Sequence, residues 1–215
     1  MGGTNHFTIF LGGDCFPTKR LRAEIADTTA IAADGGMRHA AAFGITPVLW
    51  VGDFDSTHAA LAERFPHVPR DEHPTAKDAT DGEIAIRAAL ARGATKLTIL
   101  GAFGGDRVDH ELGTIGLALA LADRAEMALT DGKQWGYPLI DGGELTVQAT
   151  PGSTLSVIGW NDLSGLTIEG VRWPLRNEMV PFGSSRTLSN EITDGGHARL
   201  TLRRGRALVV VHGQA

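Results

Sequence analysis

The chain has 215 residues, of which 42% are hydrophobic and 21% are charged. These proportions are ordinary for a soluble globular protein and exclude a disordered chain, and the length allows one large domain or two small ones. The formal net charge of -5 is spread without long like-charge runs, so there is no basic stripe for binding nucleic acid and we expect no such partner.

The single cysteine, Cys15, can form neither an internal disulfide nor a cysteine-based zinc site, and we interpret it as a small half-buried residue. The N-terminus carries no basic stretch followed by an apolar signal segment. No stretch of the chain approaches the ~18 apolar residues that a membrane-spanning helix needs. We therefore expect a cytoplasmic protein that has no membrane partner.

Short apolar runs alternate with Ala-rich segments through about residue 125, which is the pattern of strands alternating with helices. This alternation predicts a parallel sheet whose strands are buried on both faces. The predicted strands are residues 7–11, 31–33, 48–51 and 97–100, and the clearest predicted helices are residues 37–43, 80–92 and 108–124. Gly44 and Gly93 follow the first two helices, where glycine often ends a helix.

The pattern changes beyond residue 127, where Gly and Pro turns recur at short intervals between segments typical of strands. These segments are residues 144–148, 154–158, 166–169, 197–202 and 207–212. We predict an antiparallel β domain here and place its boundary at the turn Asp141-Gly142-Gly143. Residues 1–140 would then form an α/β domain, and residues 141–215 the β domain.

Four predicted strands are followed by loops that combine glycine with carboxylate. The loops are Gly12-Gly13-Asp14, Asp34-Gly35-Gly36, Gly52-Asp53-Phe54-Asp55-Ser56 and Gly101-Ala102-Phe103-Gly104-Gly105-Asp106. In open α/β sheets, ligands bind at loops that leave the carboxyl ends of strands. Glycine lets backbone amides approach phosphate oxygens, whereas carboxylates alone would repel them. A divalent cation resolves this conflict, because Asp53 and Asp55 could both bind one Mg²⁺ that also bridges phosphates. The loops therefore predict a metal nucleotide as the ligand.

Some of these motifs also have purely structural interpretations. Asp34-Gly35-Gly36 is compatible with a plain turn, and Ser56 with the cap of a following helix. Thr80-x-x-Glu83 is a capping box, although a cap does not require Lys77 and Asp78 just upstream, which a phosphate and metal site would use.

Other sequence features argue against an acid/base pair, a P-loop or dinucleotide-binding site, and a zinc site. Asp109 and His110 could be an acid/base pair, but adjacent residues on a helix point in different directions. The chain contains neither the P-loop motif nor the dinucleotide-binding glycine motif, so a γ-phosphate kinase of the usual kind is disfavoured. The histidines show no zinc-ligand spacing.

Taken in order, the motifs resemble those of the thiamine pyrophosphokinase family. In the catalytic part the resemblance rests on Asp34-Gly35-Gly36, Gly52-Asp53-Phe54-Asp55-Ser56, Lys77-Asp78-x-Thr80-Asp81 and Gly104-Gly105-Asp106-Arg107-Val108-Asp109-His110. It continues in Gly170-Val171-Arg172-Trp173-Pro174-Leu175 and Ser189-Asn190-Glu191, which look like thiamine-binding motifs, so it covers nearly the whole chain. The chain departs from the family pattern at Asp106, which separates Gly105 from Arg107, and at Gly113, where Asn is common.

The resemblance implies a Rossmann-like α/β domain that holds Mg-ATP, a β-sandwich domain that holds thiamine, and a homodimer with active sites between its subunits. The reaction implied is transfer of the diphosphate group of ATP to the hydroxyl of thiamine, with AMP leaving. Asp53, Asp55 and Asp81 would hold Mg²⁺, and Lys77 and Arg107 would meet phosphates. The nucleotide site would be completed by Asp34, Gly35, Gly36, Asp78, Thr80, Gly104, Gly105, Asp109 and His110. Trp173, Ser189 and Asn190 would line the thiamine site.

Three questions stay open at this point. The same architecture could transfer diphosphate to another heterocyclic alcohol, such as a hydroxymethylpterin, although such an enzyme need not carry Trp173 with Ser189-Asn190. A non-catalytic nucleotide or thiamine sensor would be expected to have lost acidic metal ligands, and none is lost here. Trp173, next to Pro174, is also compatible with a core or turn aromatic.

Overall fold

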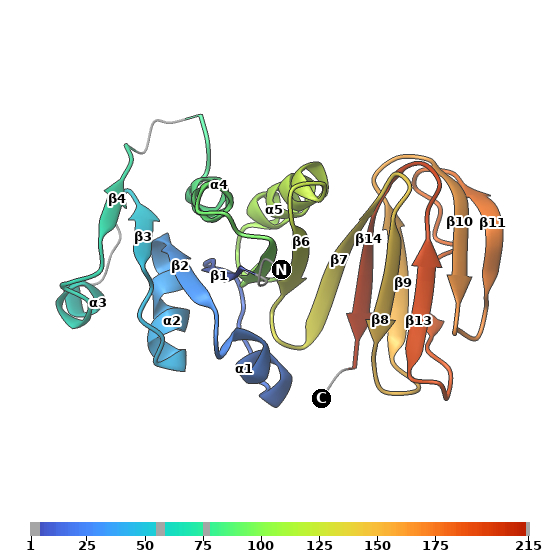
Figure 1. Cartoon of the computed structure of the whole chain (residues 1–215), viewed down its shortest axis with the longest axis horizontal. Helices are drawn as coiled ribbons and strands as arrows, with labels where there is room; N and C mark the ends of the chain where they lie inside the picture. The colour runs from blue at the N-terminus through green and yellow to red at the C-terminus, as the bar shows by residue number, and fades with distance from the viewer. Residues whose placement is uncertain (1–4, 55–58, 75–77, 214–215) are drawn as a thin grey trace. The chain divides into compact units, whose positions relative to one another are not determined.

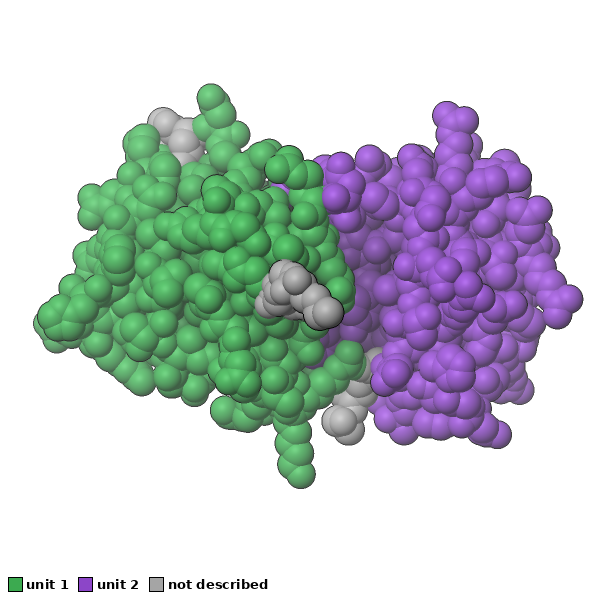
Figure 2. Space-filling view, in the orientation of Figure 1, with its two compact units in different colours: residues 1–117, 124–132 green, residues 118–123, 133–215 purple. Residues whose placement is uncertain are grey.

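A computed structural model describes residues 5–54, 59–74 and 78–213 of the chain (Figure 1). The predicted site residues Asp55 and Lys77, and the predicted cap Ser56, lie outside the described residues. The chain divides into two compact units (Figure 2), which are Met1–Leu117 with Arg124–Gly132, and Ala118–Asp123 with Lys133–Ala215. The domain boundary between residues 140 and 141 stays a prediction. Within the described ranges, no helix is both long and apolar enough to cross a membrane.

The first unit is built on a parallel sheet with the strand order β6-β5-β1-β2-β3-β4. Its elements are β1 (His6–Phe10), α1 (Lys19–Ile25), β2 (Thr29–Ala33), the 3-10 turn η1 (Asp34–Gly36), α2 (Met37–Phe43), β3 (Leu49–Gly52), α3 (Ala59–Arg64), β4 (Arg70–Glu72), α4 (Asp81–Ala91), β5 (Lys96–Leu100), α5 (Val108–Leu121), whose last four residues belong to the second unit, and β6 (Glu126–Thr130). Figure 1 shows α2 and α4 on opposite sides of this sheet. The predicted parallel sheet is confirmed.

Burial on both faces explains why these strands could be predicted. Phe7, Ile9 and Phe10 of β1 are all buried, as are most residues of β2, β3 and β5, because helices cover both sides of the sheet. The helix predicted at residues 37–43 is confirmed as α2, and Gly44 ends it in the left-handed conformation with a φ of 70°.

The second unit consists of two antiparallel sheets, with the strand orders β12-β9-β14-β7 and β11-β10-β13-β8. The strands are β7 (Gln134–Ile140), β8 (Glu144–Gln148), β9 (Thr154–Gly159), β10 (Leu163–Glu169), β11 (Leu175–Val180), β12 (Asn190–Glu191), β13 (His197–Thr201) and β14 (Arg206–His212). Leu155 and Val209 from the first sheet and Ile168 and Leu200 from the second share one buried core. Two sheets packed around one core form a sandwich, which confirms the predicted fold class.

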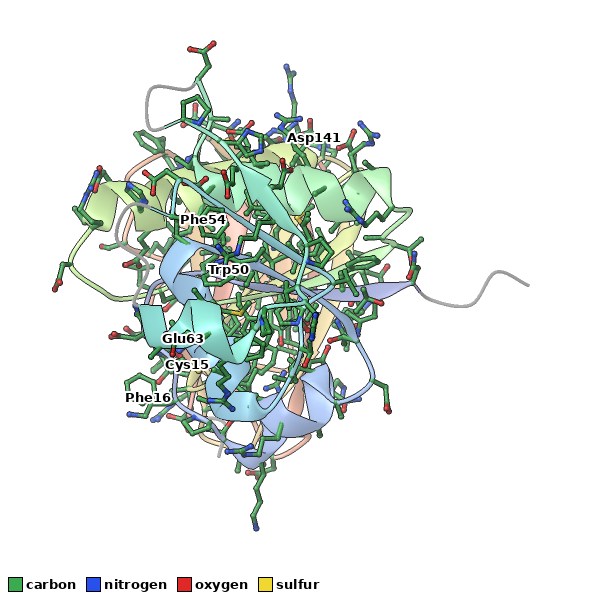
Figure 3. All side chains as sticks on the ribbon, turned by 90° about the vertical axis from the view of Figure 1, so that its left-hand side faces the viewer. Cys15, Phe16, Trp50, Phe54, Glu63 and Asp141 are labelled. Atoms are coloured by element: carbon green, nitrogen blue, oxygen red, sulfur yellow. The ribbon has the colours of Figure 1, made fainter. Side chains whose placement is uncertain are left out.

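Cys15 is partly buried, as predicted (Figure 3). Burial, together with the nearby Asp131 carboxylate, raises the pKa of the Cys15 thiol to about 11. The thiolate is the nucleophilic form of cysteine, so this thiol is largely unreactive at neutral pH.

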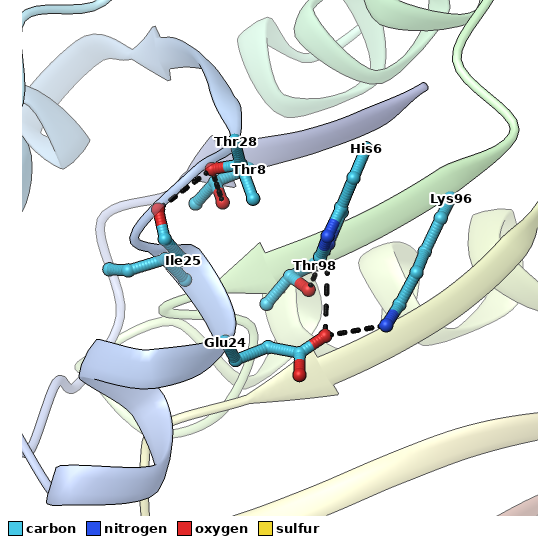
Figure 4. A network of polar contacts seen from close by, with 7 residues as sticks. All are labelled: His6, Thr8, Glu24, Ile25, Thr28, Lys96 and Thr98. Carbon is cyan, nitrogen blue, oxygen red and sulfur yellow. Dashed lines mark hydrogen bonds and ion pairs between the residues drawn. The ribbon is translucent and has the colours of Figure 1, made fainter. Parts of the chain in front are cut away.

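A polar network joins α1 to the beginnings of β1 and β5 (Figure 4). His6 Nε2 lies 2.9 Å from Thr98 Oγ1, and Lys96 Nζ lies 2.7 Å from Glu24 Oε1. Burial, and then the positive charge of Lys96, lower the pKa of His6, whereas the carboxylates of Glu24 and Glu126 act in the opposite direction. The folded protein therefore favours neutral His6.

We expect His6 to make the fold less stable as the pH falls. The pKa of His6 is lower in the folded protein than in the unfolded chain, so the unfolded chain binds a proton more readily. The stability of the fold is therefore fully present above the unfolded pKa of about 6.5. It is lost as the pH falls from there toward the folded pKa. Urea unfolding of the wild type and His6→Gln at pH 8 and pH 5 measures this difference. The variant should lose less stability between the two pH values, and equal losses would contradict the prediction.

Candidate functional site

The glycine and carboxylate loops follow strands that are neighbours in the sheet. β5, β1, β2 and β3 are adjacent and parallel. Their carboxyl ends therefore lie at one edge, and the four loops predicted to form the site leave the sheet there. This edge is called the carboxylate edge below.

Asp34 stands at the beginning of the loop after β2, in a conformation that few residues other than glycine adopt. Its φ is 42°, and its backbone carbonyl accepts a hydrogen bond of 3.0 Å from Trp50 Nε1. A Cβ atom at Gly52 would overlap Asp34 Oδ1, so the carboxylate packs directly against the loop that carries Asp53. A type I turn, the commonest kind, requires neither the positive φ nor this close approach.

Asp53 directly follows β3 and precedes Phe54, an aromatic residue that is held by its neighbours. Phe54 has a φ of 59°, and its ring packs edge-on against Trp50 with 5.1 Å between the ring centroids (Figure 3). The Arg70 guanidinium lies over both rings, 5.4 Å from that of Trp50 and 5.3 Å from that of Phe54. These contacts fix the direction in which the chain leaves the strand after Asp53.

Asp81 is the first residue of α4. Thr80 Oγ1 accepts a hydrogen bond of 3.2 Å from the Glu83 amide, so the predicted helix cap is confirmed. The Glu83 side chain pairs with Arg87 at 2.7 Å. A carboxylate in the first turn is stabilised by the helix dipole, which places Asp81 favourably whether or not it binds a ligand. Asp78, just upstream, is exposed.

The loop after β5 contains three glycines with positive φ, namely Gly101, Gly104 and Gly105, as its tight path requires. Beyond them Arg107 donates two hydrogen bonds to Asp109, of 2.9 Å and 2.7 Å, and both side chains are exposed. These bonds hold the pKa of the Asp109 carboxyl well below its usual range. A phosphate bound by Arg107 would therefore compete with Asp109. His110 is exposed.

Two residues at this edge were missed from the sequence. Arg38 donates hydrogen bonds to the Gly12 and Gly13 carbonyls, and His39 Nε2 lies 2.9 Å from the Gly13 carbonyl oxygen. A carbonyl only accepts, so Nε2 carries the proton, and burial lowers the pKa of His39. These side chains tie the loop after β1 to α2. Their position directly after Asp34-Gly35-Gly36 and Met37 is the only sequence signal for them.

In the second unit, the two motifs predicted to bind thiamine lie side by side. The Asn190 amide is hydrogen-bonded to the backbone of Trp173, at 3.1 Å to its N–H and 2.7 Å to its carbonyl. Trp173 is 56% exposed, so its interpretation as a core aromatic is wrong. The backbone amide of Ser189, whose φ is 56°, donates to Ser156 Oγ at 3.0 Å.

The described residues do not by themselves form a metal centre. Within residues 5–54, 59–74 and 78–213, no group of three or more His, Cys, Asp and Glu side chains is arranged to hold a metal ion. Asp55, one of the three predicted ligands, lies outside these ranges. The donors of Asp53 and Asp81 are carboxylate oxygens, which fit the preference of Mg²⁺ for hard ligands.

A hollow of about 360 Å³ lies in the first unit, and it is not at the carboxylate edge. It is lined by Gly44, Thr46, Arg64, Phe65, Pro66, His67 and Val68. Several of these residues lie just before β3 and β4, at the amino ends of the strands. The hollow therefore contains none of the predicted site residues.

Comparison with known proteins gives consistent matches in both units. The model described as "Thiamin pyrophosphokinase, catalytic domain" matches residues 23–129, and "Thiamin pyrophosphokinase, vitamin B1 binding domain" matches residues 144–206. The curated thiamine pyrophosphokinase of Bacillus subtilis (strain 168) is 30% identical over 173 residues, which cover 78% of each chain.

Solved structures show the same similarity over the full length. The crystal structure of a thiamine pyrophosphokinase from Bacillus subtilis has a TM-score of 0.85 and 25% identity, and covers 98% of this chain and 100% of its own. A thiamin pyrophosphokinase from Geobacillus thermodenitrificans has a TM-score of 0.81 and 26% identity, with coverages of 98% and 97%. The enzyme from Candida albicans, at 12% identity, shares the fold with a TM-score of 0.81 over 97% of this chain and 89% of its own.

Proposed function

Because this chain belongs to the thiamine pyrophosphokinase family, we propose that it transfers the diphosphate group of ATP to the hydroxyl of thiamine. The products would be thiamine diphosphate and AMP. The observation that carries this proposal is the carboxylate edge, where loops bearing Asp34 and Asp53 leave neighbouring parallel strands. Glycine-rich backbone and hard oxygen donors at one edge suit a nucleotide bound with a divalent cation.

The residues of the first unit would bind and orient the nucleotide. Asp53, Asp55 and Asp81 would hold Mg²⁺, which when bound neutralises charge on the phosphate oxygens. Lys77 and Arg107 would meet phosphates, and Arg107 would exchange its present partner Asp109 for a phosphate group. The remaining residues proposed for the nucleotide site are Asp34, Gly35, Gly36, Asp78, Thr80, Gly104, Gly105, Asp109 and His110.

The reaction requires little covalent chemistry from the protein. The thiamine oxygen would form a bond to the β-phosphorus of ATP, and the bond from that phosphorus to the oxygen that bridges the α- and β-phosphates would break as AMP leaves with that oxygen. The hydroxyl proton must be accepted in this step, and Asp81 is the carboxylate we propose for it. In-line placement of the two substrates would supply most of the rate acceleration. Trp173, Ser189 and Asn190 would form the thiamine site.

We also propose that the protein is a cytoplasmic homodimer with active sites between its subunits. Large apolar side chains of the second unit support an interface, because Met179, Phe182 and Leu188 are 57%, 67% and 43% exposed. They lie on β11 and on the segment that follows it. Contiguous exposed apolar surface is typical of interfaces with another protein, and the proposed dimer would cover these three side chains.

Product analysis tests the proposed reaction directly. Purified protein is incubated with ATP and Mg²⁺, and with either thiamine or 6-hydroxymethylpterin, and the nucleotide products are separated. We expect AMP to form with thiamine only. AMP with the pterin alone would reassign the acceptor, ADP as the product would exclude diphosphate transfer, and tight binding of ATP and thiamine without turnover would indicate a sensor.

A further inference from the structure

Trp173 combines an exposed ring with a firmly held backbone. Its side chain is 56% exposed, so it adds little to the core of the sandwich. Yet the segment before it is joined to the segment around β12. The Arg172 amide donates a hydrogen bond of 2.9 Å to the Glu191 carbonyl, and Val171 forms an isolated antiparallel β-bridge with Ile192. Fixing the backbone of an exposed residue contributes little to packing, so the position of the ring itself requires an explanation.

Asn190 supplies the contacts that hold Trp173. Its Oδ1 accepts from the Trp173 N–H at 3.1 Å, and its Nδ2 donates to the Trp173 carbonyl at 2.7 Å. Oδ1 also accepts from the Glu191 amide at 2.9 Å. Asn190 is only 7% exposed and is paired with Leu155 of β9. The oxygen and the nitrogen of the buried Asn190 amide thus bind both the N–H and the carbonyl of the Trp173 backbone.

The residues on either side of Trp173 restrict it further. Pro174 follows it, and a proline disfavours helical backbone angles in the residue before it. The Arg172 guanidinium lies 5.0 Å from the centre of the Trp173 ring and 3.4 Å from Glu191 Oε2. Backbone and ring are therefore both held before any ligand binds.

We infer that Asn190 is a positioning residue that acts on the substrate through Trp173. It fixes the backbone so that the exposed ring is already oriented to stack on a flat substrate, and preorganisation of this kind lowers the cost of binding. This inference rests on the proposed function in one respect, which is that thiamine is the flat substrate. It assigns the Asn190 amide to the protein's own backbone instead of to the ligand.

A double-mutant cycle separates these two roles. Asn190→Ala should raise the thiamine KM by about 10-fold and change kcat and the ATP KM by less than about 2-fold. In the Trp173→Ala background, the same change should alter the thiamine KM by less than about 2-fold, because the ring that it positions is gone. If the fold-changes in the thiamine KM from Asn190→Ala and Trp173→Ala multiply in the double variant, Asn190 contacts thiamine itself, and the inference is overturned.

Asn161 provides the matched control. Its Oδ1 also accepts a backbone hydrogen bond, from the Arg206 amide at 2.9 Å, in the same unit. Asn161→Ala should leave the thiamine KM unchanged. If Asn190→Ala does not fold, Asn190→Asp keeps the acceptor for both amides and loses the donor to the Trp173 carbonyl. The substitution also sets a carboxylate oxygen against that carbonyl, so the thiamine KM should again rise, and only when Trp173 is present.

A measurement without turnover keeps this inference separate from the proposed function. The chain has four tryptophans, and loss of one indole N–H signal in Trp173→Phe assigns Trp173 in the NMR spectrum. We expect fast motion of this indole to increase in Asn190→Ala and not in Asn161→Ala. Unchanged motion in Asn190→Ala would overturn the inference. A wild-type protein that does not bind thiamine would refute the proposed function and leave the NMR result standing.

Discussion

Replacing Asp53 by Asn is expected to lower turnover by about 100-fold or more and to leave the fold intact. Asp53 directly follows β3 at the carboxylate edge, between the glycine that packs against Asp34 and the anchored Phe54. Asn keeps the shape of the side chain and removes its charge, which is what a hard cation binds. Steady-state rates at saturating ATP, Mg²⁺ and thiamine measure the loss.

The melting curve distinguishes a lost ligand from a damaged fold. The Asp34 carboxylate packs against Gly52, the residue before Asp53, so removing the charge of Asp53 relieves repulsion between these carboxylates, and the melting temperature of Asp53→Asn should equal or exceed that of the wild type. Asp27→Asn is the matched control, because Asp27 is exposed and precedes β2 at the amino ends of the strands. It should keep full activity. Asp55→Asn should behave like Asp53→Asn, and full activity in both would refute the assignment.

In the parallel sheet, the strands that could be predicted from sequence are short apolar runs that are buried on both faces. β1, β3 and β5 appear as apolar runs because helices cover the sheet on both sides. β4 has the sequence Arg70-Asp71-Glu72 and lies at the edge of the sheet, so no apolar run marks it. α1 was also missed, because only Leu21 and Ile25 of its seven residues are buried.

The loops of the candidate site could be placed from sequence, but the partners of their side chains could not. The order of parallel strands brings the glycine and carboxylate loops to one edge, and this follows from the alternation of strands and helices. Nothing in the sequence indicates that Arg107 pairs with Asp109, that Arg38 binds the Gly12 carbonyl, or that Asn190 binds the Trp173 backbone. Each depends on which acceptor lies within reach in three dimensions.

Trp173→Ala is expected to raise the thiamine KM by about 10-fold or more while the ATP KM barely moves. The pyrimidine of thiamine is flat and its thiazolium is permanently charged, so an exposed Trp offers stacking together with a cation–π term of roughly 0.5 to 2 kcal/mol. Trp173→Phe should keep part of the affinity, because Phe retains a smaller aromatic face. Michaelis constants for both substrates measure the effect in all three proteins.

The exposure of Trp173 also predicts how the fold should respond to its removal. A large buried side chain replaced by Ala costs about 3 to 5 kcal/mol, but the 56% exposed Trp173 leaves no such cavity. The melting temperature of Trp173→Ala should therefore stay close to that of the wild type. Trp135, which is 1% exposed, serves as the contrast, and Trp135→Ala should melt well below the wild type. If Trp173→Ala also melts early and raises both Michaelis constants together, Trp173 supports the fold and does not stack on thiamine.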